Sequence, residues 1–141
     1  MIPELSVVVP LYNEEDSLRP LYAAITGAVE PLGVSFEIVF VDDGSKDATV
    51  RIADEIARND PRVCLVKFRR NYGQTPAMAA GIAQAGGEII ITMDGDLQND
   101  PKDIGALLRK MDEGNDIVVG WRFDRQDKLV SRKIPSRIAM P

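Results

Sequence analysis

The sequence predicts an α/β fold in which helices cover both faces of a doubly wound, mostly parallel β-sheet. Five short apolar runs rich in Val and Ile are separated by four stretches in which apolar residues recur with helical spacing. The apolar runs are continuous and do not alternate with polar residues, which is typical of parallel strands buried on both faces. Strands and helices that alternate in this way favour right-handed crossovers within one sheet.

Each expected element follows from one of these runs. The five expected strands are Leu5–Val9, Phe36–Val41, Val63–Phe68, Glu88–Met93 and Ile117–Val119. The four expected helices are Asp16–Val29, Ala48–Asn59, Thr75–Ala85 and Pro101–Glu113. Helix starts are marked by capping residues: Asp47 or Ser45 can cap the second helix, and Asp100 with Pro101 can begin the fourth.

Composition excludes several classes of function. The chain has 141 residues, of which 45% are hydrophobic, enough for the core of one soluble domain. A single cysteine rules out an internal disulfide and favours a reducing compartment. The absence of histidine excludes histidine metal ligands and histidine acid–base chemistry. The sequence shows neither a signal peptide nor the roughly 20 consecutive apolar residues of a membrane span.

The charge is distributed unevenly along the chain. Residues 122–141 have a net charge of +4, against −5 for the whole chain, so the remainder is acidic and does not suggest a nucleic-acid partner. Within the tail, the spacing of Val130, Ile134 and Ile138 predicts a basic amphipathic helix over Lys128–Met140, although Pro135 would break or kink it. Such a helix could lie on an anionic membrane surface or pack on another part of the protein. We therefore expect a core at 1–122 and a tail at 123–141.

The most informative motif is a pair of carboxylates after the fourth expected strand. Asp94 and Asp96 are separated by one glycine and directly follow an apolar run. Ligands of open α/β sheets bind at the carboxyl ends of the strands. Two carboxylates this close favour a hard divalent cation such as Mg²⁺, which takes further ligands from phosphate oxygens. Alternatively, the two side chains only shape a turn.

Other polar residues follow the neighbouring strands. After the first strand, Tyr12 can stack on a base and Glu14 can accept hydrogen bonds from a base or a sugar; both can equally belong to a helix-capping turn. After the second strand, Asp42 converges on the same sheet edge as Asp94 and could hold a nucleoside. Arg122 follows the fifth strand and could stabilise a diphosphate.

Taken together, these motifs resemble the inverting glycosyltransferases of family 2, which have the Rossmann-like GT-A fold, and within them the polyprenyl-phosphate glycosyltransferases. The resemblance rests on five segments in the family's order, Val8–Glu14, Val41–Ser45, Arg70–Gly73, Met93–Gln98 and Val119–Arg122. It implies that the residues binding the nucleotide sugar are Pro10, Tyr12, Glu14, Asp42, Asp94, Gly95 and Gln98. It implies further that the ligands of Mg²⁺ or Mn²⁺ are Asp94, Asp96 and Gln98, and that the catalytic residues are Asp96 and Arg122.

The implied reaction is the metal-dependent transfer of a sugar, with inversion, from a UDP-glucose-like or GDP-mannose-like donor to a polyprenyl phosphate. A phosphate monoester has a second pKa of about 6, so this acceptor needs little help from a general base. Family members continue beyond the point that corresponds to Pro141. We therefore expect a soluble N-terminal GT-A core from a longer protein that works at the cytoplasmic face of a membrane and could form a homo-oligomer.

Three other functions remain open from the sequence. The same site could extend a polysaccharide or another glycan. An apolar strand followed by Asp94 and Asp96 also resembles an Asp-based phosphotransferase. A non-catalytic module could bind nucleotide sugars without transferring them.

Overall fold

The structure, a computed structural model, describes residues 2–95, 101–113, 117–120 and 128–132. Its strands are β1 (Leu5–Leu11), β2 (Phe36–Asp42), β3 (Val63–Lys67), β4 (Ile89–Thr92), β5 (Ile117–Gly120) and β6 (Lys128–Arg132). Its helices are α1 (Leu18–Val29), the short 3₁₀ helix η1 (Glu30–Leu32), α2 (Thr49–Asn59), α3 (Gln74–Gln84) and α4 (Asp103–Asp112). The five strands and four helices predicted between residues 5 and 119 therefore all form, with ends that differ by at most two residues.

The strands form one sheet in the order β3-β2-β1-β4-β6-β5. The four strands from β3 to β4 are parallel, which confirms the predicted mostly parallel α/β sheet. Along the chain, β2 and β3 follow β1 on one side of it, and β4 then lies on the other side of β1. The strand order therefore reverses between β1 and β4, and ligands of doubly wound folds bind at such a switch point.

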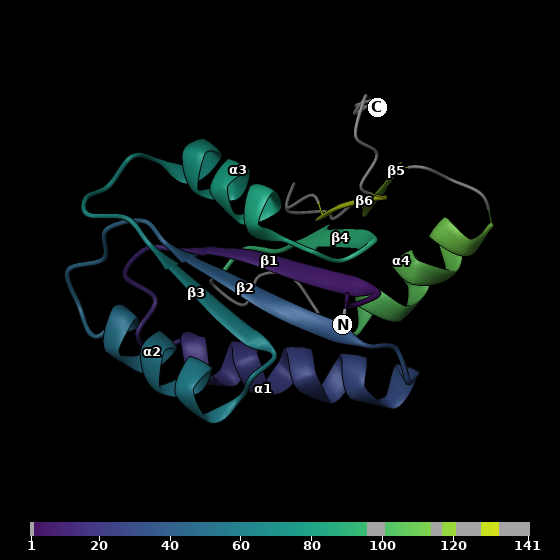
Figure 1. Ribbon diagram of the computed structural model, residues 1–141, viewed down its shortest axis with the longest axis horizontal. Helices are drawn as coiled ribbons and strands as arrows, with labels where there is room; N and C mark the ends of the chain where they lie inside the picture. Colours follow the sequence, from purple (N-terminus) through teal and green to yellow (C-terminus); the bar gives the residue numbers. More distant parts are fainter. Residues whose placement is uncertain (1, 96–100, 114–116, 121–127, 133–141) are drawn as a thin grey trace.

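Helices cover both faces of this sheet, α3 on one and α1 and α2 on the other (Figure 1). Alternate side chains of β1 face the two layers: Val7 and Val9 join the cluster packed on α1, α2 and α4, whereas Val8 joins the cluster packed on α3. All three are fully buried, which explains why this strand has no polar alternation. Of the helices in the described ranges, none has the length and apolar character needed to cross a membrane.

The predicted helix over Lys128–Met140 is wrong for its first residues. Lys128–Arg132 is strand β6, which pairs antiparallel with both β4 and β5. A physical reason is that β4 would otherwise expose the unpaired backbone groups of an edge strand, and Leu129 and Val130 suit a strand. Residues 128–132 therefore belong to the sheet of the core and not to a separate tail, and 133–140 lie outside the described residues.

A network of ionic hydrogen bonds joins α1 to the loop before β3, away from the sheet edge where ligands are expected. The carboxylate of Asp60, which is 6% exposed, accepts hydrogen bonds from Arg62 at 2.9 Å and from the hydroxyl of Tyr22. Arg62 also pairs with Glu30 at 3.0 Å. The hydrogen bonds from Arg62 lower the pKa of Asp60 to about 2, although burial opposes this shift. The hydrogen bond to Asp60, together with burial, raises the pKa of Tyr22.

This network predicts how stability responds to acid. Because the pKa of Asp60 is lower in the folded chain than in the unfolded one, its contribution is complete above about pH 4 and is lost as the pH falls towards about 2. We expect Asp60→Asn to lower the free energy of unfolding at pH 7 by about 1–2 kcal/mol, allowing for the partial exposure of Arg62. Urea unfolding of both proteins at pH 7 and pH 3 checks this. If the two proteins differ as much in free energy of unfolding at pH 3 as at pH 7, the predicted role of Asp60 is contradicted.

Candidate functional site

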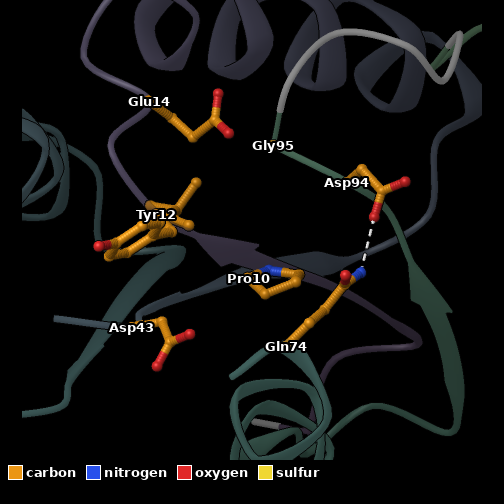
Figure 2. Close-up of a pocket in the computed structure, with 8 residues that line it drawn as sticks. Pro10, Tyr12, Glu14, Asp43, Gln74, Asp94 and Gly95 are labelled. Atoms are coloured by element: carbon orange, nitrogen blue, oxygen red, sulfur yellow. Dashed lines mark hydrogen bonds between the residues drawn. The ribbon is translucent and has the colours of Figure 1, made fainter. Parts of the chain in front are cut away.

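A cavity of about 250 Å³ lies at the carboxyl ends of β1 and β4, where the strand order reverses (Figure 2). It is lined by Pro10, Leu11, Tyr12, Glu14, Asp43, Gln74, Asp94 and Gly95. These residues come from the end of β1 with the loop that follows it, the loop after β2, the start of α3 and the loop after β4. The fold thus gathers polar side chains from four separate segments at the position where α/β sheets bind ligands.

The loop after β1 is held by hydrogen bonds to the loop after β2. The Asn13 backbone has a φ of 53°, in the left-handed region that Asn tolerates better than most residues. Its amide donates to the Ser45 hydroxyl at 2.9 Å, and its side-chain oxygen accepts from the Lys46 amide at 2.9 Å. The Glu14 amide donates to the Thr49 hydroxyl at 2.8 Å. The backbone of this loop is therefore fixed while Tyr12 and Glu14 line the cavity.

Although Ala48 occupies the N-cap position of α2, Asp47 is the one of the two predicted capping residues that hydrogen-bonds to the start of the helix. Its carboxylate accepts a hydrogen bond from the Thr49 amide at 2.9 Å, and it also contacts the Thr49 hydroxyl and the Glu15 amide. Burial would raise the pKa of Asp47, but these hydrogen bonds hold it below its usual value. The other candidate, Ser45, instead supports the neighbouring loop through Asn13.

Asp43 fixes the segment that leads into α3. This side chain is 4% exposed, and both of its carboxylate oxygens accept hydrogen bonds. The donors are the Tyr72 amide at 2.8 Å, the Gly73 amide at 3.1 Å and the Asn71 side chain at 3.0 Å. Gly73 has a φ of 107°, which favours glycine, and it immediately precedes the first residue of α3. A buried anion thus sets the position at which α3 begins.

The first residue of α3 reaches across the cavity to the loop after β4. The Gln74 side-chain amide donates a hydrogen bond to Asp94 Oδ1 at 3.0 Å (Figure 2). Next to it, Gly95 is buried, and a Cβ there would lie 2.9 Å from Leu11 and 3.1 Å from the Pro10 carbonyl oxygen. Asp94 is therefore held between α3 and a closely packed backbone segment.

A second cavity of about 420 Å³ lies beside the first, and Tyr12 lines both. Asp42, which is 1% exposed, lines this second cavity. Its Oδ2 accepts hydrogen bonds from the Gly44 and Ser45 amides at 3.1 and 3.0 Å, whereas its buried Oδ1 has no hydrogen-bond partner among the described residues. A buried acceptor that lacks a partner needs an explanation, and a ligand donor is one.

Basic side chains line the same second cavity. They are Lys46, Lys67, Arg69 and Arg70. The Arg70 guanidinium lies 4.9 Å from the centre of the Tyr72 ring, and Tyr72 meets Phe68 edge-to-face at 5.6 Å. A concave surface with this excess of cations suits an anionic ligand.

The structure brings together most of the predicted site residues that it describes. Pro10, Tyr12, Glu14, Asp94 and Gly95 line the first cavity, and Asp42 lies in the second. The predicted residues Asp96, Gln98 and Arg122 lie outside the described residues.

Sequence reasoning missed the contribution of two residues to the first cavity. It gave neither Asp43 nor Gln74 a role of its own, yet both line the cavity. The only feature of the sequence that could have indicated their contribution is that Asp43 follows the second strand and Gln74 follows the third.

The chemistry of the first cavity fits a hard cation, because its charged donors are the carboxylates of Glu14, Asp43 and Asp94. Both oxygens of Asp43 are engaged by the segment 71–73. Within the ranges that the structure describes, no three acidic, cysteine or histidine side chains lie close enough together to hold a metal ion by themselves. A cation there would thus need further ligands, such as substrate oxygens.

Comparison with known proteins identifies the family. The model of the family described as Glycosyl transferase family 2 matches residues 6–140, nearly the whole chain. The chain belongs to glycosyl transferase family 2. The sequence-based identification and the α/β fold class are both confirmed, and the match leaves no support for an Asp-based phosphotransferase.

Curated relatives and solved structures agree with this membership of family 2. The chain is 47% identical over 135 residues to the dodecaprenyl-phosphate galacturonate synthase of Rhizobium johnstonii, covering 94% of the chain and 40% of that protein. It is 43% identical over 138 residues to the undecaprenyl-phosphate 4-deoxy-4-formamido-L-arabinose transferase of Salmonella dublin, covering 97% of the chain and 42% of that protein. The chain therefore spans about two fifths of the length of these relatives.

Two solved structures resemble the family 2 fold seen here at 28% sequence identity. S. aureus TarS in complex with UDP has a TM-score of 0.68, over 81% of this chain and 34% of TarS. The mannosyltransferase PcManGT from Pyrobaculum calidifontis, in complex with GDP-Man and Mn²⁺, has a TM-score of 0.62, over 73% of this chain and 30% of PcManGT.

Proposed function

We propose that this chain is the donor-binding and catalytic core of an inverting glycosyltransferase that moves a sugar from a nucleotide donor to a polyprenyl phosphate. The observation that best supports this is the cavity at the switch point between β1 and β4, lined by Tyr12, Glu14 and Asp94. The choice of acceptor is supported by the names of the relatives, which include dodecaprenyl phosphate and undecaprenyl phosphate.

In this proposal the nucleoside occupies the second cavity. Tyr12 is 43% exposed between the two cavities, so its ring is accessible for stacking on a base. The orphan oxygen of Asp42 would accept a ring N–H, which uracil and guanine both possess. The surrounding lysine and arginine side chains would offset the negative charge of the nucleotide. Pro10 and Glu14, which line the first cavity, would border the path between the two cavities.

The diphosphate and the sugar would then lie in the first cavity. Mg²⁺ or Mn²⁺ bound by Asp94 would neutralise charge on the departing nucleoside diphosphate. Gly95 suits this position because its missing side chain leaves room beside Leu11 and the Pro10 carbonyl. We propose that Asp96 and Gln98 complete the cation's ligands and that Arg122 stabilises the leaving group.

The acceptor phosphate would attack the anomeric carbon on the face opposite to the leaving group. The bond from that carbon to the donor phosphate breaks as the new bond to the acceptor oxygen forms, which inverts the configuration. The acceptor is mainly a dianion at neutral pH, so no protein base is required. Carrying the lipid would bring the protein to a membrane surface.

A transfer assay tests this function. The chain is incubated with radiolabelled UDP-glucose, UDP-GlcNAc or GDP-mannose, Mn²⁺ and undecaprenyl phosphate in detergent, and label is extracted into organic solvent. We expect lipid-linked label with at least one donor and none with Asp94→Asn. Donor binding with transfer only to a glycan acceptor would instead favour glycan extension. Binding without any transfer, in this chain and in a protein extended to the length of its relatives, would favour a non-catalytic module.

A further inference from the structure

Gln74 is the side chain that joins helix α3 to the loop bearing Asp94. Its amide donates to Asp94 Oδ1 at 3.0 Å, and both residues line the first cavity. A carboxylate oxygen can only accept a hydrogen bond here, so the NH₂ group of the amide must face Asp94. The bond restricts rotation of the Asp94 carboxylate about its side chain.

The position of Gln74 is itself set by rigid contacts. Asp43 binds the amides of Tyr72 and Gly73, the two residues directly before Gln74. At the other end of α3, Gly81 lets the helix lie against Val8 of β1 with no space for a side chain between them. Gln74 therefore starts from a fixed backbone, which is the condition under which a supporting side chain can orient a functional one.

We infer that Gln74 is a positioning residue that holds Asp94 in the orientation needed to bind the divalent cation and, through it, the donor diphosphate. This inference rests on the proposed function and deepens it. Hydrogen-bond partners of metal ligands commonly change metal affinity by about 10–100-fold when they are removed, because an unsupported ligand must lose rotational freedom on binding. Gln74 hydrogen-bonds to Asp94, the proposed cation ligand, so its effect should appear in the cation-dependent part of binding.

The experiment compares Gln74→Met with Gln84→Met. Methionine has a similar length to glutamine but cannot donate the hydrogen bond, and Gln84 is an exposed glutamine at the far end of the same helix. Calorimetric titration with UDP and GDP, with and without Mn²⁺, gives the factor by which Mn²⁺ strengthens binding. The thermal unfolding midpoint reports on folding.

We expect Gln74→Met to reduce the Mn²⁺ factor about tenfold or more, and to leave metal-free nucleotide affinity and the unfolding midpoint unchanged. We expect Gln84→Met to change none of the three. A Mn²⁺ factor in Gln74→Met equal to that of the wild type, or an equal loss of metal-free affinity, would overturn the positioning role and leave the proposed function standing. If Mn²⁺ does not strengthen nucleotide binding to the wild-type chain, both the positioning role of Gln74 and the proposed cation-dependent function are overturned.

Discussion

Gly81→Ala is expected to lower the free energy of unfolding by about 3 kcal/mol, at the upper end of the cost of overpacking a core. Alanine usually stabilises a helix relative to glycine by about 1 kcal/mol, so helix propensity alone predicts the opposite sign. At Gly81, however, a Cβ would lie 2.3 Å from a Val8 methyl group and 3.0 Å from Val41. The helix would have to move away from β1 and β2, and the contacts of α3 with the sheet would be lost.

A second glycine provides the matched control for this prediction. Gly27 lies in α1 and is exposed, and a Cβ added there would have no atom within 4 Å. Gly27→Ala should therefore stabilise the chain by up to about 1 kcal/mol. Urea unfolding of the two variants and the wild type measures both changes in the free energy of unfolding, which are expected to have opposite signs. If Gly81→Ala is as stable as the wild type, α3 does not pack this closely on the sheet.

Asp42→Asn is expected to weaken nucleotide binding by about 10–100-fold, which corresponds to the 1.5–3 kcal/mol of a hydrogen bond to a charged group. The variant retains one side-chain oxygen that can accept from the Gly44 and Ser45 amides, so the turn should persist. The orphan Oδ1 becomes an NH₂ group, which would oppose a ring N–H instead of accepting from it. Calorimetric titration with UDP and GDP measures the loss.

The control for this variant removes the same charge elsewhere. Asp54 lies on α2 and forms a surface pair with Arg58 at 3.0 Å. Asp54→Asn should leave nucleotide affinity unchanged, because exposed pairs of this kind contribute little and neither Asp54 nor Arg58 lines either cavity. UDP methylated at the ring nitrogen should bind the wild type about as weakly as UDP binds Asp42→Asn. Unchanged affinity in Asp42→Asn would show that the orphan oxygen does not face the base.

The parallel strands could be predicted because burial on both faces leaves a direct pattern in the sequence. Val7, Val8 and Val9 must all be apolar when helices pack on both sides of β1. The positions of Tyr12 and Asp94, which line the first cavity, were predictable for the related reason that the residues after parallel strands lie at one edge of the sheet.

Other features depend on contacts between distant segments. The hydrogen bond from Gln74 to Asp94 requires the loop before α3 to be in place, and Asp43 sets that loop from about 30 residues away in the chain. Successive residues at a strand end point to opposite sides, so sequence alone could not decide whether Asp42 or Asp43 would line the cavity of Asp94. Strand β6 was mistaken for a helix because apolar spacing in the tail fits a helix, and one of its two pairing partners, β4, lies some 40 residues earlier.

The central claim is that the cavity between β1 and β4 binds the diphosphate of a nucleotide together with a divalent cation held by Asp94. Calorimetric titration of UDP and GDP into the wild-type chain and Asp94→Ala, with and without Mn²⁺, tests it most directly. We predict that Mn²⁺ strengthens binding of at least one nucleotide to the wild type by about tenfold or more, equivalent to about 1.4 kcal/mol, and that Asp94→Ala abolishes this effect. Binding of equal strength with and without Mn²⁺, or an Mn²⁺ effect that persists in Asp94→Ala, would contradict the claim.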